Sequence, residues 1–262
     1  MLRQIKNLFA FLTILPFRMD MEYLVDSARL MWLFPFVGAL LGLLAGLFGW
    51  AVGFFLPVFV VGALTLGVLL WLTGLHHTDG LLDFGDAVMF HGSPERKIEV
   101  MHDQFTGAGA IGLGLMTYVV TAFTFVSLAN YLGDFGFGVV QIPVVVSGLI
   151  VVELCAKLSM VAATWAGKAV HEGMNSPFMD AMHGKYGHAR LVVSLALSFG
   201  VAVPLLWVAG LVTVVASVVC GLVMVGIAHR HFGGVTGDVL GATNEISRMV
   251  CAVVLLAVLQ WM

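Results

Sequence analysis

The chain has 262 residues, of which 60% are hydrophobic and 10% charged, with a net charge of −3. A soluble domain carries about 25% charged residues, so this composition excludes an ordinary soluble protein. With only 12 basic residues, the net negative charge excludes a nucleic-acid-binding surface. The three cysteines stand far apart in apolar sequence, which excludes a disulfide scaffold and a cysteine-type zinc site. We predict an all-α, polytopic helical membrane protein with one integral membrane domain over 1–262.

The N-terminal stretch has the pattern of an amphipathic helix. Apolar residues repeat at helical spacing from Leu2 to Leu12, and the pattern stops at Pro16. We therefore predict an interfacial helix over 1–16 that lies on the membrane and does not cross it.

Long uncharged stretches follow, each longer than the 18 or so residues that indicate a membrane span. Pro57 divides the first of these stretches, and a turn near Gly210 divides the last. We predict about seven transmembrane helices, at 32–54, 58–75, 107–129, 139–164, 190–208, 211–228 and 245–262.

The basic residues predict the orientation, because Lys and Arg remain on the cytoplasmic side. With the N-terminus in the cytoplasm, eleven of the twelve, including Arg248, fall at or beyond cytoplasmic helix ends. The exception is Lys157, four residues after Glu153 within a span, and we predict that these two form a buried ion pair. A multi-pass protein of the cell membrane, with its chemistry on the cytoplasmic face, is expected.

An Asp-rich cytoplasmic segment, 76–106, follows the second predicted span. Asp79, Asp83 and Asp86 stand at i, i+4 and i+7, which places them on one face of a helix. Carboxylates that close repel one another, and a bound divalent cation such as Mg²⁺ removes the conflict. The other interpretation is a solvated acidic helix face. Asp103 precedes the next span and is expected to return to the same end of the bundle.

Two later cytoplasmic loops also carry polar residues. The segment 165–190 contains Glu172, and the Gly/Asp-rich segment 229–246 contains Asp238 and Glu245. These two acids are seven residues apart, so they would share one helix face. Spacing alone does not distinguish either segment from an ordinary loop.

These motifs together resemble those of cobalamin (5′-phosphate) synthases, also called adenosylcobinamide-GDP ribazoletransferases. The most specific match is the His-x-Asp-Gly-x-x-Asp-x-x-Asp pattern at 77–86. Further matching segments lie in the same order along the chain, at 11–16, 34–42, 99–107, 172–175 and 233–245. The chain departs from the family pattern at three positions where a basic residue is usual, namely Ile14, His102 and Phe105.

The resemblance implies a transferase that joins adenosylcobinamide-GDP to α-ribazole or its 5′-phosphate and releases GMP, with Mg²⁺ as the metal. The metal ligands are expected among Asp79, Asp83, Asp86, Asp103, Asp238 and Glu245. The candidates for the base are Asp83, Asp103 and His77. Cofactor or substrate binding is expected of Thr236, Gly237, Asn244 and Glu172. We expect the late motif to approach the helix of Asp79 and to complete its site.

Two other functions are compatible with the acidic motif. One is an alcohol phosphatidyltransferase, although the usual Asp-Gly-x-x-Ala-Arg element is missing after Asp79. The other is a divalent-cation transporter, although such proteins place their acids near the bilayer midplane. Association with further copies of the chain stays open.

Overall fold

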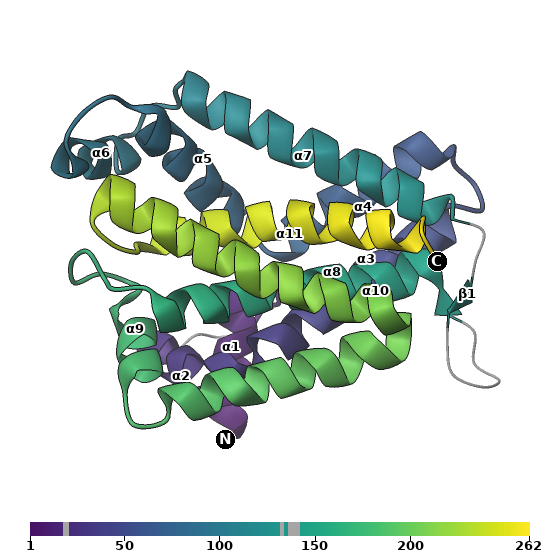
Figure 1. Ribbon diagram of the computed structural model, residues 1–262, viewed down its shortest axis with the longest axis horizontal. Coiled ribbons are helices and arrows are strands. Elements are labelled where there is room, and N and C mark those ends of the chain that lie inside the picture. The colour runs from purple at the N-terminus through teal and green to yellow at the C-terminus, as the bar shows by residue number, and fades with distance from the viewer. Residues whose placement is uncertain (18–20, 132–133, 136–141) are drawn as a thin grey trace.

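The computed structural model describes residues 1–17, 21–131, 134–135 and 142–262. Almost all regular structure in these ranges is helical, which confirms the all-α prediction (Figure 1). The helices are α1 (Leu2–Leu12), α2 (Tyr23–Arg29), η1 (Met31–Leu33), α3 (Phe34–Val52), α4 (Val58–Leu72), α5 (His76–Met89), α6 (Pro94–Met101), α7 (Ala108–Ala129), α8 (Val144–Ala166), α9 (Ser176–His183), α10 (Gly187–Phe232) and α11 (Gly237–Leu259). Two short strands, β1 (Asp134–Phe135) and β2 (Ile142–Pro143), pair antiparallel.

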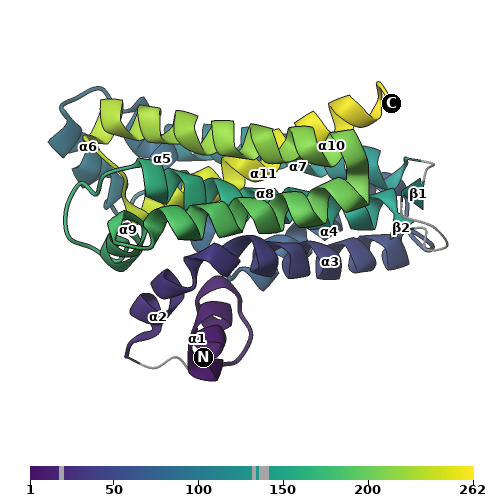
Figure 2. The same ribbon diagram turned by 60° about the horizontal axis from the view of Figure 1, so that its bottom comes forward.

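Within the described ranges, five helices are long and apolar enough to cross a membrane, or six if the bent pair α4–α5 counts as one span. The helix α10 is one of the five, but its backbone is non-helical at Trp207. There it reverses direction, so that its two halves run side by side (Figures 1 and 2). Trp207 lies at the end of the predicted span 190–208, so the reversal comes three residues before the predicted turn near Gly210. The predicted span 139–164 is α8, and its residues 139–141 lie outside the described ranges.

The helix α8 forms the centre of the bundle, with nearly all of its side chains buried. Small residues let α3 approach it closely. A Cβ atom added to Gly42 would collide with the carbonyl oxygen of Leu149, and one added to Gly46 would lie 2.8 Å from the Cα of Val146. The backbones of α3 and α8 are therefore in direct contact.

The helix α1 runs across the direction of the spans and, with α2, projects from the side of the bundle (Figure 2). Asn7 donates a 2.9 Å hydrogen bond to Asp26 of α2, and Arg3 lies 3.1 Å from the same carboxylate. Burial acts to raise the pKa of Asp26, but the Asn7 hydrogen bond and the Arg3 charge outweigh it and lower the pKa. The exposed side chains of Leu2 and Phe17 add apolar surface here. A helix is thus present at Leu2–Leu12, and its position on the membrane surface stays a prediction.

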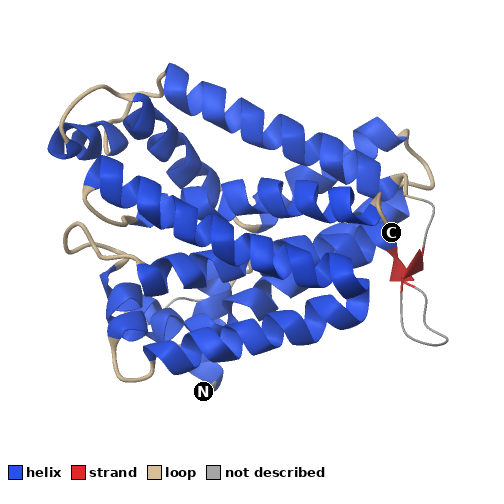
Figure 3. Cartoon of the chain, viewed as in Figure 1, coloured by secondary structure: helices blue, strands red, loops and turns tan. Residues whose placement is uncertain are grey.

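The loops gather at the two ends of the bundle (Figure 3). At the left-hand end in Figure 1 lie α6, the loop before α9 and the loop before α11. The acidic motif and both polar loops singled out in the sequence are therefore at one end of the molecule.

Candidate active site

The helix α5, which carries the three aspartates, packs between α7 and α11 (Figure 1). Its closest approach to α11 is at Gly80, where an added Cβ would lie 2.9 Å from the carbonyl oxygen of Asp238. An added Cβ on Gly241 would lie 3.3 Å from the Cα of Gly80. The two glycines bring the helix backbones together, which confirms that the late motif approaches the helix of Asp79.

Asp79, Asp83 and Asp238 form what we term the acidic mouth. Asp79 is exposed, whereas Asp83 and Asp238 are half-buried. The negative charges of Asp79 and Asp238 both act on Asp83. The Nε2 atom of His102 lies 3.9 Å from Asp238 Oδ2, so an imidazole stands beside this carboxylate. Two helices far apart in the sequence thus present their acids to one space.

Three further segments close around the acidic mouth. Val235, just before α11, donates a 2.7 Å hydrogen bond to the carbonyl of Lys168 in the loop after α8. Asn175 of that loop donates to the carbonyl of Val235 over 2.9 Å. Lys97 of α6 lies 2.9 Å from Nδ1 of His231 at the end of α10. These contacts hold the loop before α9 to the loop before α11, and α6 to the end of α10.

Asp86 has a structural partner in the next span. Its Oδ2 accepts a 2.6 Å hydrogen bond from the backbone N–H of Gly107, and its Oδ1 accepts one of 2.8 Å from Ala110. A carboxylate in this position satisfies free N–H groups at the start of α7 and interacts favourably with the helix dipole. Asp86 therefore caps α7, and both of its carboxylate oxygens are engaged there.

Thr236 likewise begins a helix. Its hydroxyl accepts a 3.2 Å hydrogen bond from Val239 N–H and donates one of 3.3 Å to Met101 Sδ. Thr236 is buried, whereas the neighbouring Gly237 is exposed with no atom within 4 Å of an added Cβ. Thr236 is thus the N-cap of α11, and Gly237 leaves open space beside Asp238.

Glu245 lies two turns deeper and is fully enclosed. Its carboxylate forms an ion pair with Arg248, which also pairs with Glu153 of α8. The side-chain amide of Asn244 donates a 3.0 Å hydrogen bond to Glu245. Both Glu245 oxygens thus have protein partners. The sequence prediction placed Arg248 at a cytoplasmic helix end, which is wrong: it is buried because it neutralises two carboxylates inside the bundle.

Lys157 bonds to Asn244, not to Glu153. Its ammonium donates a 2.7 Å hydrogen bond to Asn244 Oδ1 and lies 3.5 Å from His77 Nε2. The predicted Glu153–Lys157 ion pair is therefore wrong, because Arg248 of α11 reaches Glu153 instead. His77 is buried against this network, and its Nδ1 has no hydrogen-bond partner among the described residues.

Asp103 and Glu172 lie on the surrounding loops. Both are exposed, and Asp103 Oδ1 accepts a 3.3 Å hydrogen bond from the backbone N–H of Phe105. His171, next to Glu172, has its ring 5.9 Å from that of His102. His171 and His102 were not among the predicted site residues, although His102 stands where the family pattern has a basic residue and His171 stands next to Glu172.

The chemistry of the acidic mouth suits a hard divalent cation. Carboxylate oxygens are the ligands that Mg²⁺ prefers, and it usually keeps several waters and takes substrate phosphates. Among the described residues, no three or more His, Cys, Asp and Glu side chains form a ready-made metal cage. Asp79, Asp83 and Asp238 offer carboxylate oxygens at this end of the bundle, and a cation here would need waters and substrate oxygens to complete its ligands. Both oxygens of Asp86 and of Glu245 are engaged elsewhere.

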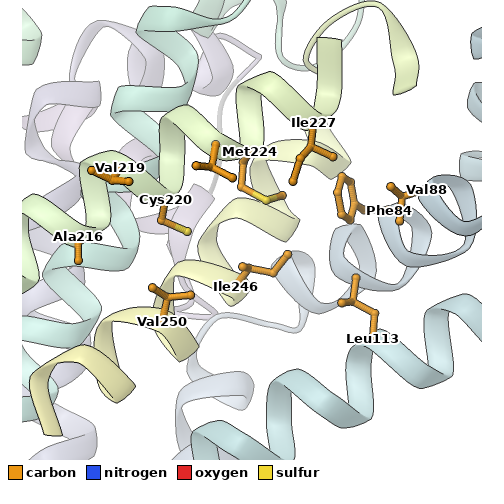
Figure 4. A pocket seen from close by; sticks show the side chains of 11 residues that line it. Phe84, Val88, Leu113, Ala216, Val219, Cys220, Met224, Ile227, Ile246 and Val250 are labelled. Atoms are coloured by element: carbon orange, nitrogen blue, oxygen red, sulfur yellow. The ribbon is translucent and has the colours of Figure 1, made fainter. Parts of the chain in front are cut away.

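An apolar pocket of about 510 Å³ lies beside the site, between α5, α7, α10 and α11 (Figure 4). Phe84 and Val88 of α5 point into it from one side, and Met224 and Ile227 of α10 from the other. Phe84 follows Asp83 directly, and consecutive residues of a helix point in different directions. One side of α5 is therefore acidic and another side is apolar. The pocket can hold an apolar group but offers no partner for a phosphate.

The fold defines a polytopic helical membrane protein, and Asp79, Asp83 and Asp238 gather at one end of its bundle. The family model described as cobalamin-5-phosphate synthase matches residues 4–256, so the chain belongs to this family. It is therefore an enzyme of cobalamin synthesis.

Several relatives resemble the chain over nearly its whole length. Proteins named adenosylcobinamide-GDP ribazoletransferase from Methanococcoides burtonii, Methanosarcina barkeri and Methanocella arvoryzae are 30%, 31% and 34% identical to it. The alignments cover 96%, 97% and 100% of this chain and 90%, 92% and 98% of the relatives. No solved structure matches the chain.

Proposed function

We propose that the protein transfers the phosphoryl-linked cobinamide of adenosylcobinamide-GDP to α-ribazole or its 5′-phosphate, in a reaction that depends on Mg²⁺. The names of the relatives support the substrate adenosylcobinamide-GDP and the ribazole acceptor. A ribose hydroxyl oxygen forms a bond to the phosphorus that bears cobinamide. The bond from that phosphorus to the GMP oxygen breaks, and GMP leaves.

The observation that carries this proposal is the contact of Gly80 with Asp238, which brings the acids of α5 and α11 to one space. Carboxylates alone would repel a diphosphate. Asp79, Asp83 and Asp238 would hold a divalent cation between them and the substrate, and its positive charge would offset the negative charge of the diphosphate and of the departing GMP. The acidic mouth therefore suits the joint binding of a metal ion and a phosphorylated substrate.

The remaining residues act on the substrate from around the acidic mouth. The proton of the incoming hydroxyl passes to a carboxylate at this end of the bundle, for which Asp83 and Asp103 are the candidates. His77 is unsuited to this role, because it is buried beside Lys157. His102, beside Asp238, offers an N–H group to a phosphate at a position where the family pattern has a basic residue.

We place this end of the bundle in the cytoplasm, because the basic residues gather around it. A cysteine at exposed Gly92, in the loop before α6, should resist an impermeant thiol reagent in intact cells. A cysteine at exposed Phe55, in the turn between α3 and α4 at the other end, is the matched control and should react. Reaction at Gly92 and not at Phe55 would reverse the orientation.

The function is tested by incubating the purified protein with adenosylcobinamide-GDP, α-ribazole and Mg²⁺ and measuring GMP. We expect GMP release that requires all three components. GMP release without α-ribazole would indicate a hydrolase, and no release under any condition would contradict the proposal. Ion flux into liposomes without GMP release would support the divalent-cation transporter instead.

A further inference from the structure

A second pocket, of about 420 Å³, lies between α2, α9 and the start of α10. None of the residues assigned to the acidic mouth lines it. Its charged lining residues are Arg29, Lys185 and Arg190, with Asp180 as the one carboxylate. Three positive charges against one negative charge make the pocket cationic, in contrast to the acidic mouth.

The cationic groups of this pocket form no ion pairs with carboxylates of the described residues. Within the described ranges, no carboxylate lies in ion-pair distance of Arg29, Lys185 or Arg190. Arg190 donates a 2.6 Å hydrogen bond to the carbonyl of Ala181 and one of 3.3 Å to that of Arg29, which fixes its guanidinium between α9 and α2. Placing an anion here therefore displaces no ion pair.

The surroundings of the pocket are those of a membrane interface. Val25 lines the pocket and is 42% exposed, and Tyr186, also in its lining, is 59% exposed. The exposed apolar side chains of Leu15, Phe17 and Met21 flank the nearby helices α1 and α2. Exposed apolar groups beside cationic and aromatic ones are typical of surfaces that sit at the headgroup level of a bilayer.

We propose that this pocket binds the phosphate of an anionic phospholipid, with Arg29, Lys185 and Arg190 around the phosphate. Basic pockets between helices on the cytoplasmic side bind such headgroups. The Nε and Nη1 atoms of Arg190 already donate to carbonyls, so its Nη2 group is the one left to donate a charge-assisted hydrogen bond to a phosphate. A soluble phosphate shares this chemistry, but the apolar surface of α1 and α2 favours the lipid, whose acyl chains it can contact. This inference uses the proposed cytoplasmic placement of this end of the bundle but not the proposed reaction.

The test uses the full chain in detergent, titrated separately with short-chain phosphatidylglycerol, short-chain phosphatidylcholine and inorganic phosphate. Binding is followed by native mass spectrometry and by the thermal unfolding midpoint. We expect phosphatidylglycerol to bind more tightly than phosphatidylcholine. Arg29→Gln and Lys185→Gln should each weaken its binding about fivefold, the effect of one basic residue near an anionic headgroup.

Lys6→Gln is the matched control, because Lys6 is an exposed basic residue of α1 that does not line the pocket. Both pocket residues are exposed, so their replacement should leave folding intact. Equal binding of inorganic phosphate and phosphatidylglycerol, both weakened by the pocket variants, would support the phosphate site but overturn the lipid as its source. Equal losses in Lys6→Gln and the pocket variants would overturn the site and indicate diffuse surface charge.

Discussion

Gly80→Ala tests whether the contact between α5 and α11 positions the acidic mouth. The new Cβ would lie 2.9 Å from the carbonyl oxygen of Asp238, whereas ordinary contact begins at 3.4 Å, so the helices must separate by about 0.5 Å. A misplacement of ~1 Å at a catalytic site can cost about a hundredfold in rate, so half of that should cost about tenfold. Overpacking should also lower the free energy of unfolding by about 1–3 kcal/mol, partly offset by the better helix propensity of alanine.

The assay is the rate of GMP release, with the thermal unfolding midpoint measured on the same samples. Gly112→Ala in α7 is the matched control, because an added Cβ there has no atom within 4 Å. It gains the same helix propensity without a collision and should retain normal activity. If Gly80→Ala were as active and as stable as Gly112→Ala, the close approach at Gly80 would not position the site.

Three further predictions follow from individual contacts. Asp83→Asn keeps the size of the side chain but removes a negative charge from the acidic mouth. GMP release should therefore fall about a hundredfold or more while the protein still folds. Near-normal rates would mean that the aspartates form only a solvated helix face. Arg248→Met should lower the free energy of unfolding by about 3–5 kcal/mol, because it leaves two buried carboxylates unpaired. Adding Glu153→Gln to Arg248→Met should recover part of this loss in thermal unfolding, and no recovery would refute the pairing. Folding lowers the pKa of Asp26, so its carboxylate stabilises the fold at a pH above the ordinary pKa of 3.8, and this stabilisation is lost as the pH falls below that value. The thermal unfolding midpoint of the wild type should therefore fall more on acidification than that of Asp26→Asn. Equal falls would contradict this reasoning.

The sequence was sufficient for the features that depend on periodicity and composition. Uncharged stretches predicted the apolar helices, and the turn predicted near Gly210 lies close to the reversal at Trp207. The approach of the late motif to α5 was also predicted, because both segments fall on the same side of the membrane. The glycines at 80 and 241 supply its physical basis.

Pairing between helices could not be predicted, because periodicity shows which face a residue occupies but not which neighbour faces it. Glu153 and Lys157 are four residues apart on one helix, which suggested a pair, yet Arg248 approaches from α11 and takes Glu153. Asp86 has the spacing of a metal ligand, but the start of α7 offers it two free N–H groups. Glu245 shares a face with Asp238 but lies deeper, where Arg248 pairs with it.

The central claim is that α5 and α11 share one divalent cation at the acidic mouth. Mn²⁺ suits the same oxygen ligands as Mg²⁺ and is paramagnetic, so its binding can be titrated by the loss of the free-ion signal in electron paramagnetic resonance. Asp83→Asn and Asp238→Asn should each weaken Mn²⁺ binding at least about tenfold, whereas Asp180→Asn, an exposed carboxylate outside the acidic mouth, should bind as the wild type does. Wild-type binding in Asp238→Asn would contradict the claim, because the cation would then belong to α5 alone.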